Sequence, residues 1–132
     1  MKKYFPTIIE YQPYSICNAN CEYCPVGSIN RANKDKGAPI SEDLFKKMLN
    51  DTVGKKVDVI SPHLNCEPLL CKNLSYQIKE WKKIHPHAKI VFSTNCVFLT
   101  EDKFLEMVEC GVDTLELHYM GVNKDFHEMS MK

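Results

Sequence analysis

The sequence predicts an α/β fold in which four parallel strands alternate with helices. Short runs rich in β-branched and aromatic residues recur along the chain, and segments with helical apolar spacing separate them. Strands that are joined through helices of this length form right-handed βαβ crossovers, and hence a parallel sheet. The length of 132 residues fits one domain.

Each of the four strands is predicted from its own segment. The first contains Pro13 but is otherwise rich in β-branched and aromatic side chains. The last alternates Leu115, Leu117 and Tyr119, which is the period of a strand. The four predicted strands cover residues 7–15, 57–64, 89–93 and 113–119.

Three helices are predicted to begin at capping residues. Ser41, Asn73 and Thr100 each precede an apolar stripe with helical spacing. The second helix ends at 85–86, because a proline disfavours the α conformation at the residue before it. Gly111 lies where a glycine commonly ends a helix. The stripes expected to face inward are Leu44, Phe45, Met48 and Leu49 in the first helix, Leu74, Ile78, Trp81 and Ile84 in the second, and Phe104, Leu105 and Val108 in the third.

The composition limits the classes of function. Lys and Arg together number 17, and so do Asp and Glu, which gives no general attraction to nucleic acid or to an anionic membrane surface. No apolar run approaches the roughly 20 residues that span a bilayer, and no apolar segment follows the two N-terminal lysines as in a secretory signal. A cytoplasmic location is therefore expected. An odd number of cysteines, seven, argues against a fully paired disulfide framework.

The ligand site is expected just after the strands, since parallel α/β sheets bind ligands at the carboxyl ends of their strands. The segments to consider are 17–25, 65–70, 93–96 and 118–121. Most of the unusual residues of the chain fall in them. Cys71 and Cys110 are interpreted as small hydrophobic residues. His85 and His87 are expected in solvent.

Three cysteines form the strongest motif. Cys17, Cys21 and Cys24 follow a C-x3-C-x2-C spacing directly after the first predicted strand. Cysteine thiolates, usually four of them, hold iron–sulfur clusters. Three ligands leave one iron open to a substrate or cofactor, by the logic that separates open catalytic zinc sites from closed structural ones.

Other interpretations of the triplet remain open at this point. The cysteines could pack by chance, or bind zinc together with a histidine or another cysteine. A closed four-cysteine cluster could also form, with Cys66, Cys71 or Cys96 as the fourth ligand. The C-x2-C-x2-C spacing of bacterial ferredoxins does not match.

The motif resembles the signature of the radical S-adenosylmethionine (radical SAM) enzymes, C-x3-C-x-aromatic-C, with Tyr23 at the aromatic position. Residues 63–70 resemble the Gly-Gly-Glu-Pro segment of this family after strand two. Residues 93–100 resemble its Thr-Asn-Gly segment after strand three. Residues 111–117, followed by Gly121, resemble its fourth helix-to-strand passage. The likeness runs in order from about residue 7 to residue 123.

The resemblance implies a role for each matching residue. Cys17, Cys21 and Cys24 would each ligate one iron of a [4Fe–4S] cluster, and S-adenosylmethionine would chelate the fourth iron. Glu67 would accept a hydrogen bond from the amine of the cofactor. The remaining expected cofactor-binding residues are Tyr23 near the adenine, Thr94 and Asn95 in the pocket wall, and His118, which stands where a ribose-binding serine is common.

The resemblance also implies the reaction. The reduced cluster would cleave S-adenosylmethionine to methionine and a 5′-deoxyadenosyl radical, which abstracts hydrogen from a substrate that the sequence does not identify. The style of the motifs is similar to that of family members that modify peptides or proteins. An electron donor such as flavodoxin or ferredoxin would be a partner. Two rival functions are a non-catalytic iron–sulfur electron-transfer module and a zinc-stabilised binding module.

The chain departs from the family pattern in several places. Asn65 and Cys66 replace the paired glycines, Cys96 replaces the glycine after Asn95, and Met120 stands where an aspartate is common. The core of the family is a partial (β/α) TIM-like barrel of six βα units. The expected fold is such a barrel truncated to about four units, so that residues 1–132 form an incomplete N-terminal portion of a radical SAM core domain. Residues 125–131 would begin a further helix.

Overall fold

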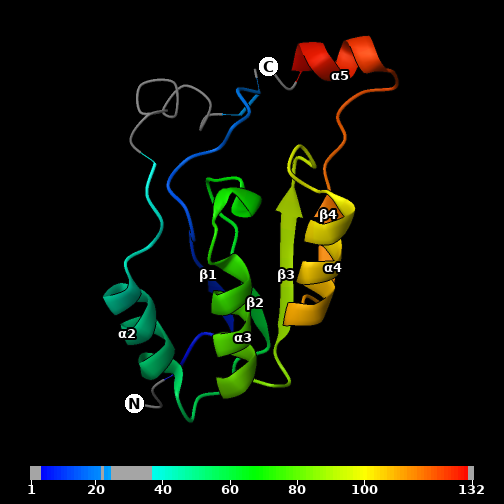
Figure 1. Cartoon of the computed structure of the whole chain (residues 1–132). Coiled ribbons are helices and arrows are strands. Elements are labelled where there is room, and N and C mark those ends of the chain that lie inside the picture. The colour runs from blue at the N-terminus through cyan, green and yellow to red at the C-terminus, as the bar shows by residue number, and fades with distance from the viewer. Residues whose placement is uncertain (1–3, 22, 25–36, 131–132) are drawn as a thin grey trace.

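The computed structural model describes residues 4–21, 23–24 and 37–130, and it confirms the predicted α/β class. Four parallel strands lie in the order of the sequence, and their order in the sheet is β1-β2-β3-β4 (Figure 1). In register, Ile9 pairs with Ile60, Ile60 with Ile90, and Ser93 with Glu116. The strands are β1 (Ile8–Glu10), β2 (Val59–Ser61), β3 (Lys89–Thr94) and β4 (Thr114–Leu117).

Each crossover between neighbouring strands contains a helix, as predicted. Helices α3 and α4 lie over the same face of the sheet, and α2 packs beside α3 (Figure 1). A short 3-10 helix, η2, directly precedes α3, and α5 follows β4. The helices are α2 (Glu42–Thr52), η2 (Pro68–Leu70), α3 (Leu74–Ile84), α4 (Glu101–Cys110) and α5 (Lys124–Ser130). The expected end of the last helix, residue 131, lies outside the described residues.

The helix boundaries follow from local hydrogen bonds. The hydroxyl of Ser41 accepts from the Leu44 amide, and that of Thr100 accepts from the Lys103 amide, so both predicted caps are confirmed. Gly111 ends α4 with a left-handed φ of 102°, which glycine adopts at little cost. Asn73 precedes α3 as predicted, but its side chain does not cap. It instead accepts from the Cys71 thiol.

Three of the predicted strands are shorter than expected: β1, β2 and, by three residues, β4. The first strand ends at Glu10, and only the Tyr11 amide continues its pairing by donating to Ser61. Pro13, two residues further, has no amide hydrogen to donate to a ladder. The second strand ends at Ser61, directly before Pro62. Each proline thus releases the chain from the sheet early, and the residues after β1 and β2 are loops.

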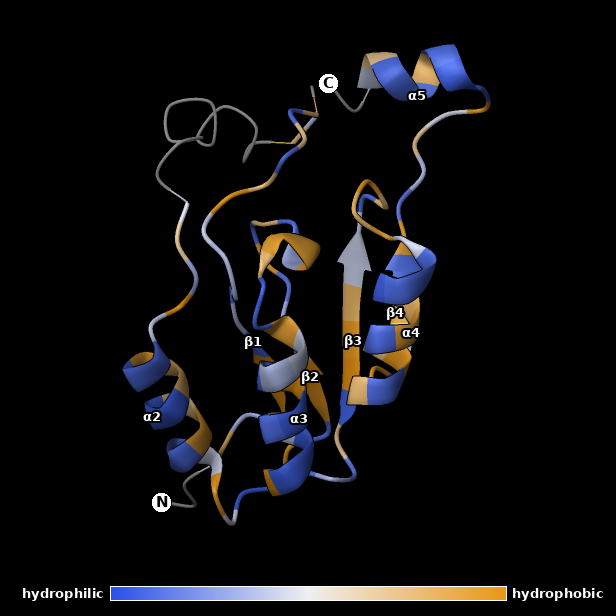
Figure 2. Cartoon of the chain, in the orientation of Figure 1, coloured by the Kyte–Doolittle hydropathy of each residue, from blue (hydrophilic) through white to orange (hydrophobic). Residues whose placement is uncertain are grey.

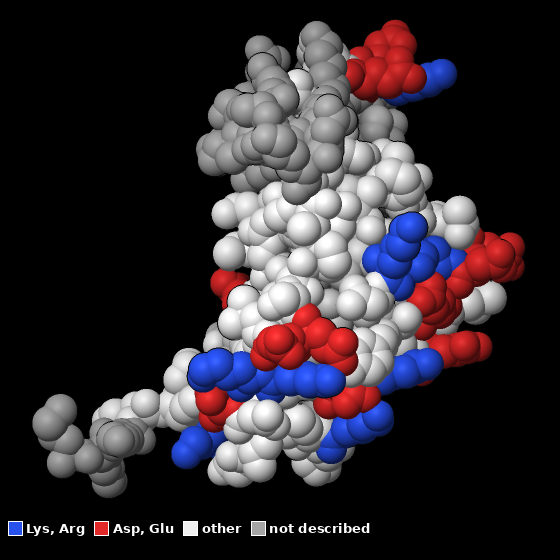
Figure 3. All heavy atoms as spheres, turned by 60° about the vertical axis from the view of Figure 1, so that its left-hand side comes forward, with Lys and Arg blue, Asp and Glu red and all other residues white. Residues whose placement is uncertain are grey.

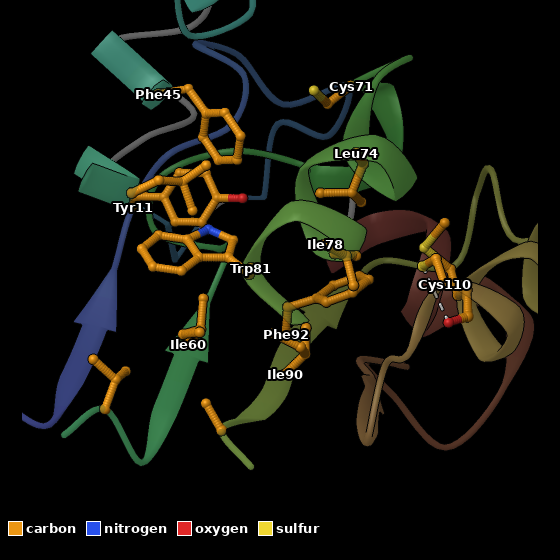
Figure 4. Close-up of a cluster of buried hydrophobic side chains, with 14 of the residues drawn as sticks. Tyr11, Phe45, Ile60, Cys71, Leu74, Ile78, Trp81, Ile90, Phe92 and Cys110 are labelled. Carbon is orange, nitrogen blue, oxygen red and sulfur yellow. Dashed lines mark hydrogen bonds between the residues drawn. The ribbon is translucent and has the colours of Figure 1, made fainter. Parts of the chain in front are cut away.

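The hydrophobic core lies between the sheet and its helices (Figure 4). The rings of Phe45, Tyr11 and Trp81 meet there, with Phe45 and Trp81 edge to face at 6.3 Å between ring centroids. Ile60 and Ile90 reach the same core from the strands and are fully buried. Figure 2 shows the corresponding pattern, with hydrophobic residues in the strands and hydrophilic stretches on the helices.

The predicted inward stripe of α4 is wrong. Phe104, Leu105 and Val108 are 47%, 50% and 55% exposed, while Met107 and Cys110 are buried in the core. The helix is turned so that Met107 and Cys110, three residues apart, share the inward face. Contacts with α3 accompany this orientation, since the hydroxyl of Ser75 in α3 bonds to the Glu106 carboxylate. Cys110 and Cys71 are buried, as predicted for small hydrophobic residues.

The prediction of a solvent-exposed His85 is also wrong. The residue is only 7% exposed, and its Nε2 lies 2.8 Å from the hydroxyl of Thr52 in α2. Its ring centroid is 5.9 Å from that of Trp81. The histidine therefore links the ends of α2 and α3, where an aromatic ring fills space and its nitrogen finds a partner. His87, two residues later, is exposed as predicted.

The surface carries charges of both signs. Figure 3 shows one face of the molecule, where basic and acidic side chains lie next to each other. In α2, Lys46 pairs with Glu42 and Lys47 with Asp51, each one helical turn apart. This mixture agrees with the balanced composition. None of the described helices is long and apolar enough to cross a membrane.

Candidate functional site

A cavity of about 150 Å³ opens at the carboxyl ends of the strands. Loops after β1 and β2 and the ends of β3 and β4 form its wall, which is where parallel α/β sheets bind ligands. All eight residues that the sequence predicted for the site line it: Cys17, Cys21, Tyr23, Cys24, Glu67, Thr94, Asn95 and His118.

The cysteine loop follows β1 and is tied to the rest of the cavity by polar contacts. The Asn95 amide donates to Asn18 Oδ1 at 2.9 Å and approaches the Cys17 sulfur at 3.7 Å. The Cys24 amide donates to the Cys21 carbonyl at 3.1 Å, and the resulting turn holds the last two cysteines near each other. Burial raises the pKa of the Cys17 thiol, and hydrogen bonds from Ala19 and Asn95 partly oppose that rise.

The three cysteines fit an iron–sulfur cluster by the chemistry of their donor atoms. All three side chains are neither fully buried nor fully exposed, and all line the same cavity. Among the described residues, no group of three His, Cys, Asp or Glu side chains is close enough to hold a single metal ion. A four-iron cluster makes a different demand, because each thiolate binds a different iron.

Glu67 is held firmly at the base of the cavity. It is 2% exposed and accepts three hydrogen bonds. Its Oε1 accepts from the Leu69 amide at 3.1 Å and from the Thr94 hydroxyl at 2.7 Å, and its Oε2 accepts from the Asn95 amide at 2.9 Å. A carboxylate has about four acceptor positions, so Oε2 keeps one for a donor in the cavity.

Thr94 and Asn95 act mainly on their neighbours in the site. The Thr94 hydroxyl donates to Glu67 and accepts from the Cys96 amide, so both of its functions are used within the protein. Asn95 joins Glu67, through its backbone amide, to Cys17, through its side chain. The end of β3 thereby connects the predicted cluster ligands with the predicted amine acceptor.

Two cysteines stand where the family pattern has glycine, and they differ in consequence. Cys96 has a φ of 67°, in the left-handed region that favours glycine. Its backbone is therefore strained at the position where the family has glycine. Cys66 is buried and lines the cavity. Burial raises the pKa of its thiol to about 11, which keeps it protonated near neutral pH.

Tyr23 and His118 lie at the outer rim of the cavity. Tyr23 is 57% exposed, which leaves its ring accessible from solvent. The His118 backbone amide donates to the Thr94 carbonyl at 2.9 Å, which extends the β3–β4 pairing beyond β4. The side chain of His118 is thus held at the level of Thr94 and Asn95.

Sequence reasoning missed three residues of the site. Asn18 orients Asn95, while His63 and Ser93 line the cavity. Ser93 lies within segment 93–96, which the topology singles out, so its position alone could have identified it, whereas His63 lies just before segment 65–70. Burial is the main cause that lowers the pKa of His63 below its usual value.

Comparison with known proteins agrees with this geometry. The model of the radical SAM superfamily matches residues 11–132, and the chain belongs to this superfamily. It is 33% identical over 114 residues to an S-adenosyl-L-methionine-dependent 2-deoxy-scyllo-inosamine dehydrogenase of Niallia circulans, a match that covers 85% of this chain and 44% of the relative.

Two crystal structures of BtrN are similar to the whole arrangement. One shows BtrN in complex with AdoMet and 2-DOIA; it is 29% identical, has a TM-score of 0.78, and covers 97% of this chain and 51% of BtrN. The other shows BtrN in an open conformation, with 28% identity, a TM-score of 0.77, and coverage of 93% and 54%. The partial TIM-like barrel predicted from the resemblance is therefore confirmed. The chain spans about half the length of these relatives.

Proposed function

We propose that this chain binds a [4Fe–4S] cluster through Cys17, Cys21 and Cys24 and uses it to cleave S-adenosylmethionine reductively. The observation that carries the proposal is the meeting of these cysteines with Glu67 and Asn95 around one cavity. The cluster, once bound and reduced, supplies the electron that splits the cofactor into methionine and a 5′-deoxyadenosyl radical.

The protein's own groups supply binding and orientation in this proposal. Glu67 offers the free acceptor position of Oε2 to the amine of the cofactor, a charge-assisted hydrogen bond. Thr94 fixes that carboxylate from the other side through Oε1. In this proposal His118 contacts the ribose and Tyr23 the adenine, and both residues line the cavity. An electron donor of the flavodoxin or ferredoxin type would reduce the cluster.

The reaction proposed for the radical is hydrogen abstraction from a small molecule. The relative that is 33% identical is described as a dehydrogenase of 2-deoxy-scyllo-inosamine, and the structure of BtrN holds 2-DOIA. These relatives favour a small substrate over the peptide or protein substrate that the style of the motifs predicted. The reaction at the substrate is proposed by analogy with them.

The test is anaerobic reconstitution with iron and sulfide, followed by EPR of the reduced cluster with and without S-adenosylmethionine. We expect four irons per chain and a change of the EPR signal on addition of the cofactor. Cys17→Ala, Cys21→Ala and Cys24→Ala should each lose the cluster, while Cys110→Ala, in the core far along the chain, should keep it. A wild-type signal that ignores S-adenosylmethionine, or a chain that takes up zinc and no iron, contradicts the proposal.

One observation supports a second candidate, a closed electron-transfer cluster. Cys66 lines the same cavity as the triplet, whereas Cys71 donates its thiol hydrogen to Asn73 and the Pro13 carbonyl. Cys96 is not among the residues that line the cavity, so Cys66 is the candidate for a fourth ligand among the three inner cysteines. Cys66→Ala separates the two functions. The radical-enzyme proposal expects the cluster of this variant to persist and to respond to the cofactor, and the electron-transfer alternative expects its loss.

A further inference from the structure

The sheet presents two different faces, and the described helices α3 and α4 cover only one of them (Figure 1). Side chains alternate along strands, so Ile60, Ile90 and Phe92 point toward the helices and are buried in the core. Ser93 and Glu116 pair in register and therefore share the opposite face. Helices α3 and α4 lie on the core side (Figure 1). On the opposite face Ser93 lines the cavity, and Glu116 lies beside it on β4.

The contact between Ser93 and Glu116 leaves mainly hydrogen-bond acceptors on this side of the cavity. The Ser93 hydroxyl donates to Glu116 Oε2 at 2.7 Å, and Ser93 is only 6% exposed while lining the cavity. Because its hydrogen is committed to Glu116, the serine oxygen can only accept from a molecule in the cavity. Glu116 itself, like any carboxylate, is an acceptor as well.

His63 completes the same wall from the neighbouring strand. It lines the cavity and follows β2 by two residues, and it interacts electrostatically with Glu67, His118, Glu116 and Glu10. As a neutral ring it offers one donor and one acceptor. Among the described residues, neither Glu116 nor Glu10 takes part in a salt bridge. The wall is therefore rich in acceptors, and no salt bridge among the described residues neutralises Glu116.

We propose that His63 and Ser93, which line this cavity, together with Glu116, which is bonded to Ser93 beside it, form a substrate-binding wall and select a small molecule that carries hydroxyl groups and an ammonium group. The inference rests on the proposed function, because it places the substrate beside the residues assigned to the cofactor. Hydroxyl hydrogens meet the oxygen of Ser93 and the ring nitrogen of His63. The ammonium group lies toward Glu116, where a charge-assisted hydrogen bond is stronger than a neutral one. An anionic molecule of similar size is disfavoured by the same carboxylate.

Calorimetric titration of the reconstituted chain tests the wall, with 2-deoxy-scyllo-inosamine and gluconate as probes. Both carry several hydroxyl groups, but the first bears an amine and the second a carboxylate. We expect the inosamine to bind at least tenfold more tightly than gluconate in the presence of S-adenosylmethionine. Glu116→Gln should reduce this preference at least fivefold, and Ser93→Ala should lower the affinity for the inosamine. Glu109→Gln, which removes a carboxylate from the exposed side of α4, is the matched control.

Several results would overturn the assignment. These are equal binding of the two probes, binding of neither, or a Glu116→Gln chain that behaves as the Glu109→Gln control does. Loss of the cofactor-induced EPR change in Glu116→Gln would also overturn it, because the residue would then serve the cofactor. Because Ser93 is buried, thermal unfolding of Ser93→Ala is measured first, to show that this variant is folded. Glu116 is exposed, so if Ser93→Ala is unfolded, the binding preference of Glu116→Gln alone decides whether the wall binds the substrate. If S-adenosylmethionine leaves the EPR signal of the wild-type cluster unchanged, the proposed function fails. Titration of the two probes without the cofactor then still shows whether the wall prefers the amine over the carboxylate.

Discussion

The hydroxyl of Thr94 donates to Glu67 Oε1 at 2.7 Å, across 27 residues of sequence. This bond joins the last residue of β3 to the residue that caps η2, and both partners are buried. The carboxylate proposed to bind the cofactor amine is thereby fixed before any cofactor arrives. A site whose groups are already oriented loses less conformational entropy on binding.

Replacement of Thr94 by valine should therefore lower both stability and cofactor affinity. The change keeps the shape of the side chain but removes one donor from a buried carboxylate, at a cost of about 1–3 kcal/mol in the free energy of unfolding. Urea denaturation measures it. Thr114→Val on β4, where the threonine is exposed, is the control and should change stability little. Equal effects of the two variants would show that the bond to Glu67 contributes nothing.

Cys96→Gly should stabilise the chain, by up to about 1 kcal/mol, because the residue adopts a φ of 67° that a side chain disfavours. Thermal or urea unfolding of the variant checks this. The same substitution at Cys110 should have the opposite sign, since that cysteine is buried within α4 and glycine weakens helices. A destabilised Cys96→Gly would mean that contacts of the thiol outweigh the backbone strain.

Asn95→Leu should lower the reduction potential of the proposed cluster. The Asn95 amide lies 3.7 Å from the Cys17 sulfur, and hydrogen bonds to cluster sulfurs stabilise the more negative, reduced form. A bond worth about 1 kcal/mol corresponds to roughly 40 mV for a one-electron couple. A redox titration followed by EPR measures the shift. Asn50→Leu, on exposed α2, is the control, and an unchanged potential in Asn95→Leu would remove Asn95 from the surroundings of the cluster.

His85 should make the fold sensitive to mild acid. Burial lowers the pKa of His85 in the folded chain, so the unfolded chain takes up a proton first as the pH falls through about 6.5. The free energy of unfolding therefore has its full value above that pH and decreases as the pH falls below it. Urea denaturation of the cluster-free chain between pH 8 and pH 5 should show a flatter profile for His85→Gln than for the wild type.

The controls for this profile come from the other histidines. His87→Gln should leave the profile unchanged, because His87 is exposed. His63, whose pKa is also lowered by burial, should account for part of the slope that remains in His85→Gln. A His85→Gln profile as steep as that of the wild type would exclude His85 as the cause.

Much of this molecule could be predicted from local patterns. The parallel α/β class follows from the alternation of strands and helices, and the caps at Ser41 and Thr100 follow from residue type. The position of the site follows from topology together with the cysteine spacing. These features depend on short stretches of sequence, and their physical causes are local.

The predictions that failed depend on contacts between distant segments. The inward face of α4 is set by its packing against α3 and the sheet, and a stripe such as Phe104 and Val108 does not reveal which side has a neighbour. The burial of His85 requires Thr52, 33 residues away. The bond between Ser93 and Glu116 needs the β3–β4 register, which no single strand contains.

Amino-acid substitutions on the two faces of the sheet have different consequences. Within β3, Phe92 packs into the core, whereas its neighbour Ser93 faces the cavity. A substitution at the first position repacks the protein, while one at the second changes the lining of the cavity. The lining can thus change residue by residue on one side of a strand, while the other side, and with it the support of the cysteine loop, stays the same.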